Sequence, residues 1–318
     1  MKKALFIIVA LILALLTVEG FLRYMVNYPP FGVQQKVHYR QGTGYWSNLY
    51  KPHSAYWNVE GGNVVFQKNN CGLPGTDIDL QSNKRIAVLG TSFVEAIQMP
   101  PGEMATSVFS TLLNQQETRY GVFNLGCSGH DPYDSYFRLL YFDQLYHFDT
   151  AILVINSDNA DWFKRHPHPL PFEPDAHFGR IDQSRISNEQ IRLRNASSII
   201  ALMANGLRSD RNEQGAEEAA GVKKDDEMTA GNVFTDDMKQ TLLAFSHKYP
   251  SFIAVSLIND NNFNQQISDF CSENRIHFNS KPLVVPRYML HGGGHLNQEG
   301  NRLLGQLLYD AYMDLIGH

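Results

Sequence analysis

The sequence predicts an α/β fold in which parallel strands are connected by helices. Two observations lead to this prediction. Short apolar runs of strand length alternate along the chain with longer segments of helical periodicity. Each of the first three apolar runs also ends in a polar or glycine-containing turn. Because parallel strands joined by right-handed crossovers have their carboxyl ends at one edge of the sheet, these turns are expected to lie close together.

The length and composition fit one such domain with an N-terminal attachment. The chain has 318 residues, of which 43% are hydrophobic and 19% are charged, close to the average for globular proteins. A formal net charge of -5 and the lack of a basic stripe with interleaved aromatic residues argue against nucleic-acid binding. The three cysteines, Cys71, Cys127 and Cys271, allow one disulfide with one thiol left over, and the sequence does not say whether any pair forms.

Residues 1–26 are predicted to be a signal anchor. Lys2 and Lys3 precede the apolar run Ala4–Val18, which is the pattern of an export signal. The helical pattern continues beyond the best small-residue cleavage site at Val18–Gly20, so an uncleaved transmembrane helix is favoured over a cleaved signal peptide or a buried core helix. In this topology the two lysines stay in the cytoplasm, and the rest of the chain lies on the periplasmic or extracellular side of the cell membrane.

Residues 27–84 are expected to form an N-terminal extension that packs on the main domain. They are rich in Tyr, Trp, Gly and Asn and contain short β-prone pieces such as Asn63–Lys68. This segment is too short and irregular to be a separate domain. The main domain is therefore expected to span residues 85–318.

The main domain begins with three strands that each end in a polar turn, with helices between them. The expected order is strand Ile86–Leu89, turn Gly90–Ser92 leading into a helix-like segment, helix Glu103–Asn114, strand Val122–Leu125, turn Gly126–His130, helix Tyr133–Tyr146, strand Ala151–Ile155 and turn Asn156–Asn159. The alternation places Ser92, Gly129 and Asn159 at the same edge of the sheet, although they are far apart in the sequence.

An insertion at about residues 164–232 interrupts this alternation. It begins with a proline-rich loop, contains a helical pattern at Ser197–Leu207, and ends in a charged stretch that is poor in large apolar residues and typical of a surface insertion. The elements expected after it are helix Asp236–His247, strand Phe252–Leu257, helix Phe263–Glu273, a short strand Arg275–Phe278 and helix Gln298–Ile316.

Ser92 and His295 are the candidates for catalysis. Ser92 stands where a strand gives way to a helix, which lifts its hydroxyl out of the sheet and directs backbone N–H groups toward a developing oxyanion. His295 lies in the glycine-rich stretch His291–Asn297 at the same edge, from which an imidazole can reach back to the serine as a general base. Plainer interpretations are that Ser92 is a helix cap and that His295 is a cap or turn residue.

Four segments in this order resemble the SGNH/GDSL hydrolase family, in its membrane-anchored bacterial form. The segments are Gly90–Phe93, Asn124–Gly129, the strand that leads to Asn159, and Gly294–Asn297 with Glu299 and Gly300. The upstream segment Asn70–Gly75 is also similar to one that often precedes the first segment in this group. The resemblance covers about residues 69–315 apart from the insertion.

The resemblance implies a flavodoxin-like three-layer α/β/α sandwich with a mostly parallel sheet, and chemistry on acyl esters. Ser92 would be the nucleophile and His295 its base. The oxyanion would be held by the N–H groups of Ser92 and Gly129 and by the side-chain amide of Asn159, with Asn156 as the alternative amide. Several such donors make physical sense, because the loss of one typically costs about 10²–10³ in rate.

Two residues depart from the family pattern. Thr91 replaces the aspartate that usually follows the first glycine, and Gly292 stands where an acid is expected three residues before the histidine. In serine proteases a change of the triad Asp to Asn costs about 10⁴ in kcat, because the acid fixes the imidazole tautomer and stabilises its charge. A Ser–His pair remains possible if a backbone carbonyl, or the remote Asp260, orients the ring.

Neither a thiol nucleophile nor a metal or cofactor site is expected. Cys127, beside Gly129, is interpreted as a small buried apolar residue. His166, His168 and His177 lie at a proline-broken spacing that lacks the geometry of metal ligands.

The resulting hypothesis is a membrane-anchored serine esterase or O-acyltransferase acting on acyl esters, with cell-envelope carbohydrate preferred by analogy with the family. Water or a sugar hydroxyl could accept the acyl group. The alternative is a family member that has lost its acid and binds a glycan or a partner protein through the same cleft. The sequence leaves the substrate, the acceptor and the oligomeric state open.

Overall fold

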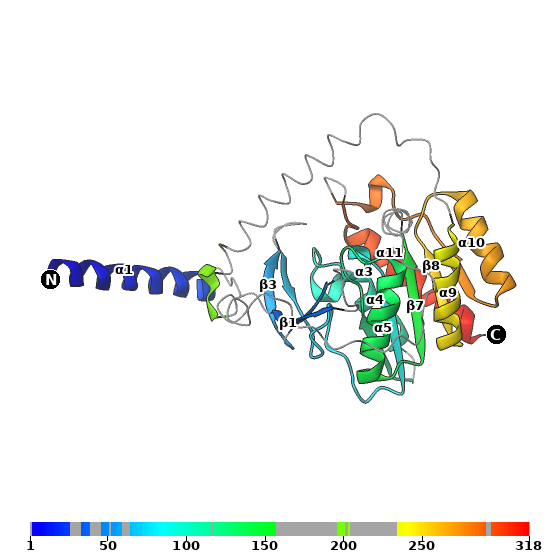
Figure 1. The fold of residues 1–318 in the computed structure, drawn as a ribbon, viewed down its shortest axis with the longest axis horizontal. Coiled ribbons are helices and arrows are strands. Elements are labelled where there is room, and N and C mark those ends of the chain that lie inside the picture. The colour runs from blue at the N-terminus through cyan, green and yellow to red at the C-terminus, as the bar shows by residue number, and fades with distance from the viewer. Residues whose placement is uncertain are drawn as a thin grey trace.

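A five-stranded parallel sheet forms the centre of the structure (Figure 1). The computed structural model describes residues 2–25, 33–38, 46–50, 52–58, 64–115, 118–156, 196–200, 203, 234–290 and 294–317. The sheet order is β6-β5-β7-β8-β9, and the strands are β5 (Lys84–Leu89), β6 (Tyr120–Asn124), β7 (Thr150–Ile155), β8 (Phe252–Ser256) and β9 (His277–Ser280). In chain order this is the flavodoxin-like arrangement 2-1-3-4-5, so the predicted α/β fold is confirmed.

Helices cover both faces of this sheet and complete the three layers. Successive strand residues alternate between two cores: Ala87 and Leu89 lie in the first, and Ile86 and Val88 in the second. β7 is buried along its whole length because it is covered on both faces. The first core is closed by α5 (Pro132–Tyr146), α9 (Asp236–Lys248) and α10 (Asn261–Glu273), and the second by α3 (Ser92–Glu95), α4 (Ala105–Leu113) and α11 (Gln298–Ile316).

The order of the strands reverses between β5 and β7. From β5 the chain passes to β6 on one side and then crosses to β7 on the other. In open α/β sheets, ligands bind in the crevice that such a switch point creates at the carboxyl ends of the strands. The turns that follow β5 and β7 therefore occupy the position where a functional site is expected.

Two differences from the sequence-based expectation coincide with a left-handed backbone conformation. The helix after Ser92 is a single turn that ends at Ala96, whose φ of 51° is left-handed, so its dipole is weaker than that of a long helix. The last strand begins at His277 rather than at Arg275, because Arg275 has a φ of 57° that a strand does not allow.

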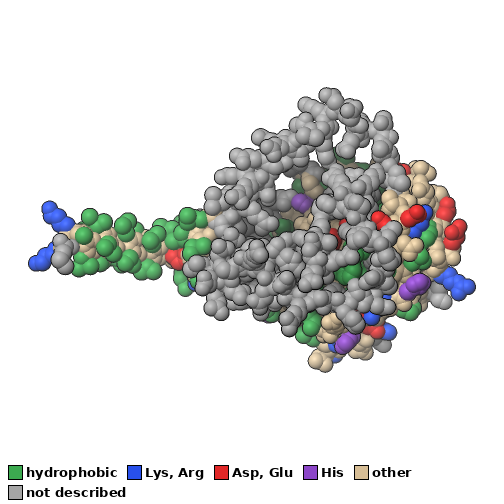
Figure 2. All heavy atoms as spheres, viewed as in Figure 1, with side chains coloured by type: hydrophobic (Ala, Val, Ile, Leu, Met, Phe, Trp, Pro, Cys, Tyr) green, Lys and Arg blue, Asp and Glu red, His purple; other side chains and the backbone are tan. Residues whose placement is uncertain are grey.

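The N-terminal helix projects away from the rest of the structure (Figure 1). α1 (Lys2–Gly20) continues into a π-helical turn, η1 (Phe21–Met25). Together they are long and apolar enough to cross a membrane, with a mean hydropathy of 2.7 in a stretch of which nothing is buried. Figure 2 shows hydrophobic side chains along this helix and basic side chains at its free end. A signal sequence would have the same properties, so the helix does not distinguish an anchor from a signal peptide.

Four short strands of the N-terminal extension lie between this helix and the sheet (Figure 1). Phe66 is buried with Ala96, Met99 and Met104 in a small core where the extension meets the main domain.

The boundaries at residues 27–84 and 85–318 remain a prediction, and the insertion at about 164–232 lies almost wholly outside the described residues. The strands pair antiparallel, β1 (Val33–His38) with β2 (Trp46–Tyr50) and β3 (Ala55–Asn58) with β4 (Val64–Gln67). Two single 3-10 turns, η2 (Pro101–Glu103) and η3 (Pro286–Tyr288), complete the described elements.

The chain just after β6 touches α3 at Gly126, which generates a prediction about stability. A Cβ atom added there would lie 2.7 Å from the carbonyl carbon of Val94 and still closer to the backbone nitrogen of Glu95. Because these are backbone atoms, only a displacement of α3 relieves the contact. We expect Gly126→Ala to lower the free energy of unfolding by about 1–3 kcal/mol, measured by urea denaturation of the detergent-solubilised chain. Gly102→Ala is the control, since its Cβ would meet no atom within 4 Å; equal stability of the two variants would contradict the contact.

Candidate active site

Ser92 is the first residue of α3, directly after β5, and its side chain is half-buried. The residue that caps this helix is Thr91, whose Oγ1 accepts a hydrogen bond from the backbone N–H of Phe93 at 3.4 Å. The interpretation of Ser92 as a helix cap is therefore wrong.

Thr91 holds this first turn at the position where the family pattern has an aspartate. Besides capping α3, its Oγ1 accepts a hydrogen bond from Nδ2 of Asn156 at 2.9 Å. Thr91 is 4% exposed and Asn156 1% exposed, so the bond lies away from water, where a polar contact is electrostatically strongest. The side chain of Thr91 thus connects the ends of β5 and β7 at the switch point.

Hydrogen bonds join the turn after β6 to the turn that carries Ser92. The buried Asn124 donates from Nδ2 to the carbonyl oxygen of Val94 at 2.7 Å and accepts the backbone N–H of Gly126 at 3.0 Å. The backbone N–H of Cys127 donates to the carbonyl oxygen of Gly90 at 3.0 Å. Two of the segments that the sequence singled out are therefore in direct contact.

Gly129 lies in a tight turn that runs from Cys127 to His130. The backbone N–H of His130 donates to the carbonyl oxygen of Cys127 at 3.1 Å, and Gly129, the third residue, has a φ of 80°. A positive φ at this position is typical of a type II turn and favours glycine. A Cβ on Gly129 would meet no atom within 4 Å, so the backbone conformation, and not lack of space, accounts for the glycine.

His295 lies beside the turn that carries Ser92. Its imidazole ring packs against the ring of Phe93, the residue after Ser92, with the centroids 6.3 Å apart and an interplanar angle of 55°. The side chain of His295 is half-buried. The structure thus brings together the segments of Ser92 and His295, which are about two hundred residues apart in the chain.

The backbone around His295 is held on both sides. Its carbonyl oxygen accepts the N–H of Leu290 at 2.8 Å, and the carbonyl oxygen of the buried Leu296 accepts Nε2 of Gln98 at 3.2 Å. The N-cap of α11 is Asn297, whose side chain accepts the N–H of Gly300 at 2.9 Å. The interpretation of His295 as a helix cap is therefore wrong.

Several residues named from the sequence lie outside the described residues. These are Asn159, Gly292, His166, His168 and His177. Asn159 as an oxyanion donor therefore stays a prediction. Asp260, the remote substitute for the missing acid, caps α10, and its carboxylate accepts the N–H of Phe263 at 3.0 Å.

A buried ion pair lies beside the turn after β6, and the sequence did not indicate this pair. Nζ of Lys68, which is 2% exposed, lies 3.9 Å from Oε1 of Glu95 and 4.1 Å and 4.5 Å from the ring centroids of Tyr50 and Phe66. Oε2 of Glu95 accepts both the backbone N–H and the hydroxyl of Ser128, at 2.8 Å and 2.7 Å. Only the inward position of Lys68 could have been suspected from the sequence, because side chains two residues apart on a strand lie on the same face and Phe66 is apolar.

Burial changes the pKa of two groups in this region. It lowers the pKa of Lys68 from 10.5 to about 8, although the Glu95 carboxylate raises it. It raises the pKa of the Cys127 thiol from 9.0 to about 12, which disfavours a thiolate. The residue is half-buried and not fully buried as the sequence suggested. All three cysteines, Cys71, Cys127 and Cys271, are free, so the disulfide that the sequence left open is not formed in this structure.

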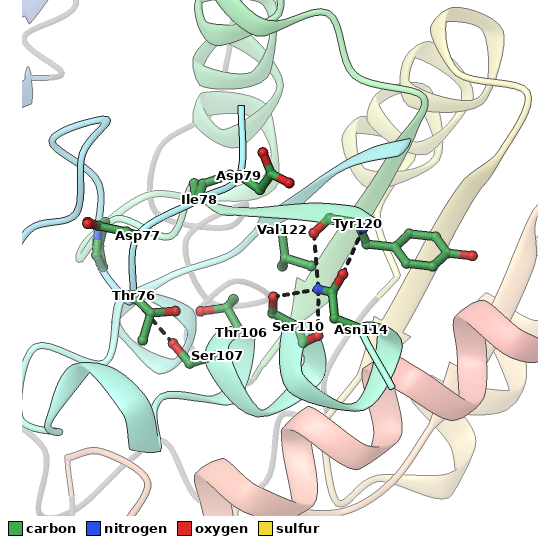
Figure 3. A pocket seen from close by; sticks show the side chains of 12 residues that line it. Thr76, Asp77, Ile78, Asp79, Thr106, Ser107, Ser110, Asn114, Tyr120 and Val122 are labelled. Carbon is green, nitrogen blue, oxygen red and sulfur yellow. Dashed lines mark hydrogen bonds between the residues drawn. The ribbon is translucent and has the colours of Figure 1, made fainter. Parts of the chain in front are cut away.

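A separate polar cavity of about 140 Å³ lies between residues 74–79, α4 and β6 (Figure 3). Figure 3 shows the hydroxyl of Ser107 next to Thr76, and the amide of Asn114 bonded to Ser110 and to Tyr120. Neither Ser92 nor His295 lines it, so this cavity is distinct from the candidate site.

The low pKa of Lys68 generates a prediction about stability and pH. Between pH 8 and pH 10.5 the unfolded chain keeps a proton on Lys68 that the folded chain has lost, so the stability contributed by this residue rises with pH in that range. In Lys68→Met this dependence is removed. We expect the free energy of unfolding of the wild type to rise relative to Lys68→Met by about 2–4 kcal/mol across that range, measured by urea denaturation at several pH values.

The matched control for that measurement is Lys84→Met. Nζ of Lys84 also lies 3.9 Å from a carboxylate, that of Asp149, but its side chain is 54% exposed. The wild type and Lys84→Met should differ by a constant amount between pH 8 and pH 10. A Lys68→Met difference that is equally independent of pH would contradict the lowered pKa.

No model of a protein family matches the sequence, and a comparison with curated proteins finds no match either. Solved structures do resemble it. The esterase EstA from Pseudoalteromonas sp. is 12% identical to this chain and has a TM-score of 0.43. The matched region covers 74% of this chain and 100% of the EstA chain. A protein of the G-D-S-L family from Desulfitobacterium hafniense is 12% identical, covers 72% and 99%, and has a TM-score of 0.42. The acetylxylan esterase Axe2 from Geobacillus stearothermophilus is 12% identical, covers 75% and 96%, and has a TM-score of 0.38.

These neighbours include proteins of the class that the sequence motifs resemble. At such low identities and TM-scores we infer nothing about activity from them.

Proposed function

We propose that the chain is a serine ester hydrolase of the SGNH/GDSL type, held at a membrane by its N-terminal helix. The observation that carries this proposal is the packing of the His295 ring on Phe93, directly after Ser92. A nucleophile needs a base within reach, and here an imidazole lies against the turn that presents the serine. The location at the topological switch point of a parallel sheet supports the same conclusion.

In the proposed reaction, Ser92 Oγ attacks the carbonyl carbon of an acyl ester while His295 takes the hydroxyl proton. The tetrahedral intermediate then expels the alcohol, which receives that proton from His295, and an acyl group remains on Ser92. In a second step His295 takes a proton from water, or from the hydroxyl of another molecule, as that oxygen attacks the acyl carbon. The bond from the acyl carbon to Ser92 Oγ then breaks, and Oγ receives the proton from His295. Hydrolysis and acyl transfer therefore differ only in the acceptor.

The oxyanion of the intermediate would be stabilised by the backbone N–H groups of Ser92 and Gly129. Hydrogen bonds from Asn124 to Val94 and from Cys127 to Gly90 hold these two segments together before substrate binds, as preorganised stabilisation requires. The side-chain amide of Asn159 is the proposed third donor. The amide of Asn156 already donates to Thr91, which supports the choice of Asn159 over its neighbour.

The substrate proposed here is an acyl ester of cell-envelope carbohydrate. A membrane helix at the N-terminus would keep the site close to the envelope, where such esters occur. Gly292 stands at the position where the family resemblance leads us to expect an acid. We therefore expect a slower reaction than that of a complete triad, unless another group orients the imidazole.

Covalent labelling tests the nucleophile. We expect the detergent-solubilised full chain to hydrolyse p-nitrophenyl acetate and to react with a fluorophosphonate at Ser92. Ser92→Ala should abolish labelling and lower kcat by about 10⁴ or more, because the nucleophile and its base act as a unit. Mass spectrometry of the labelled peptide identifies the site.

Two substitutions serve as controls for that experiment. Ser272→Ala changes an exposed serine of α10 and His247→Asn an exposed histidine of α9, and both should leave turnover and labelling unchanged. His295→Asn should lower both. A wild type that neither turns over nor labels would support the alternative of a binding protein without activity, and undiminished turnover in Ser92→Ala would contradict the site.

Fractionation tests the anchor. We expect the chain to stay in the membrane fraction after carbonate extraction and to keep its N-terminal residues, because the helix over Lys2–Met25 is apolar enough to span a bilayer. A protease added to the outside of the cytoplasmic membrane should digest the domain. A shortened chain in the soluble fraction would show instead that the segment is a cleaved signal.

A further inference from the structure

The Lys68–Glu95 ion pair is bonded to the turn that carries Gly129, through Ser128. Glu95 is the last residue of α3, three residues after Ser92, and each of its carboxylate oxygens has a different partner. Oε1 faces the ammonium of Lys68 at 3.9 Å, and Oε2 accepts two hydrogen bonds from Ser128. One carboxylate therefore connects α3, the N-terminal extension and the second turn.

Ser128 and Gly129 flank the central peptide of the turn from Cys127 to His130. The orientation of this peptide distinguishes a type I from a type II turn, and the N–H of Gly129 belongs to it. The two hydrogen bonds from Ser128 to Glu95, at 2.7 Å and 2.8 Å, restrain the residue before this N–H. A charged acceptor makes such bonds shorter and stronger than a neutral one does.

Lys68 places a positive charge beside this acceptor. Its Nζ lies 3.9 Å from Oε1 of Glu95, whose side chain is only 12% exposed, so little water screens the attraction between the two groups. The ammonium of Lys68 is held between the rings of Tyr50 and Phe66, and the next residue, Asn69, is fixed by a backbone hydrogen bond to Leu73 at 2.8 Å. The cation is thus built into the extension and is not a mobile surface charge.

We propose that Lys68 and Glu95 are positioning residues that hold the N–H of Gly129 toward the oxyanion of the reaction. This inference rests on the proposed function and deepens it. The N-terminal extension then completes the active site in addition to joining it to the membrane helix.

The pair also makes the site sensitive to pH. Among the described residues, the charged and titratable groups that face Lys68 are Tyr50 on β2, Glu95 on α3, Arg138 on α5 and Cys127 in the turn. Burial lowers the pKa of Lys68 to about 8; Glu95 opposes this effect and Arg138 adds to it. Above this pH the amine is neutral and Glu95 loses its cation. The value of kcat is therefore expected to fall as the pH rises through about 8.

The test compares kcat and KM for p-nitrophenyl acetate over a range of pH in the full-length, detergent-solubilised protein. Lys68→Met should lower kcat by about 10-fold or more, since a misplaced donor costs less than a missing one, while KM changes by less than about 3-fold. Lys68→Arg should restore kcat at neutral pH and lose the fall near pH 8, because a guanidinium stays charged and stacks on aromatic rings. Lys84→Met, which disrupts an exposed pair of the same separation, should match the wild type.

A second readout does not depend on activity. Hydrogen exchange of the peptide that spans residues 126–131 should be faster in Lys68→Met than in the wild type or in Lys84→Met. Unchanged kcat and unchanged exchange in Lys68→Met would overturn the proposal, and so would a Lys68→Arg variant that keeps the fall in kcat near pH 8. If the wild type shows no turnover that depends on Ser92, the proposed function fails, and the exchange rates alone decide whether Lys68 holds the turn.

Discussion

The hydrogen bond from Asn156 to Thr91 joins the two strands between which the order of the sheet reverses. The proposed arrangement of the site depends on this hydrogen bond. It fixes the turn of Ser92 to the end of β7, while the bond from Cys127 to Gly90 fixes the turn after β6 to the same place. Three strand ends are thereby held in one arrangement by buried polar contacts, which cost free energy if they are broken without replacement.

A glycine makes the close approach of these segments possible. Gly126 lies against the backbone of α3, where any side chain would collide with Val94 and Glu95. Polar groups beside this contact are hydrogen-bonded: Asn124 bonds to both sides of it, and Glu95 bonds to Ser128. Packing and polar satisfaction therefore favour the same geometry, which is the condition for a rigid site.

The fold, and the location of the turns after β5 and β6 at one edge of the sheet, could be predicted because they depend on local patterns. Apolar runs predicted the strands, and the helix Gln298–Ile316 was predicted with the bounds that the structure has. Alternation of strands and helices implied that Ser92 and Gly129 share an edge. The one-turn length of α3 was not predictable, because the helix ends at Ala96 in a left-handed conformation that an alanine does not favour.

The inward position of Lys68 had a weak signal in the alternation with Phe66, but its pairing with Glu95 had none in the sequence. A lysine at the end of a strand ordinarily extends its ammonium into water, and the choice of an inward position depends on Tyr50, Phe66 and Glu95, which come from three different elements. Such pairs depend on tertiary contacts between distant segments. Their partners become visible only when the chain is folded.

The most direct measurement for the central claim is a crystal structure of the protein after reaction with a phosphonate. We predict phosphorus bonded to Oγ of Ser92, one phosphonyl oxygen at hydrogen-bond distance, about 3 Å, from the backbone nitrogen of Gly129, and the imidazole of His295 on the side of the leaving group. Phosphorus on another residue, or a phosphonyl oxygen turned away from Gly129, would contradict the account.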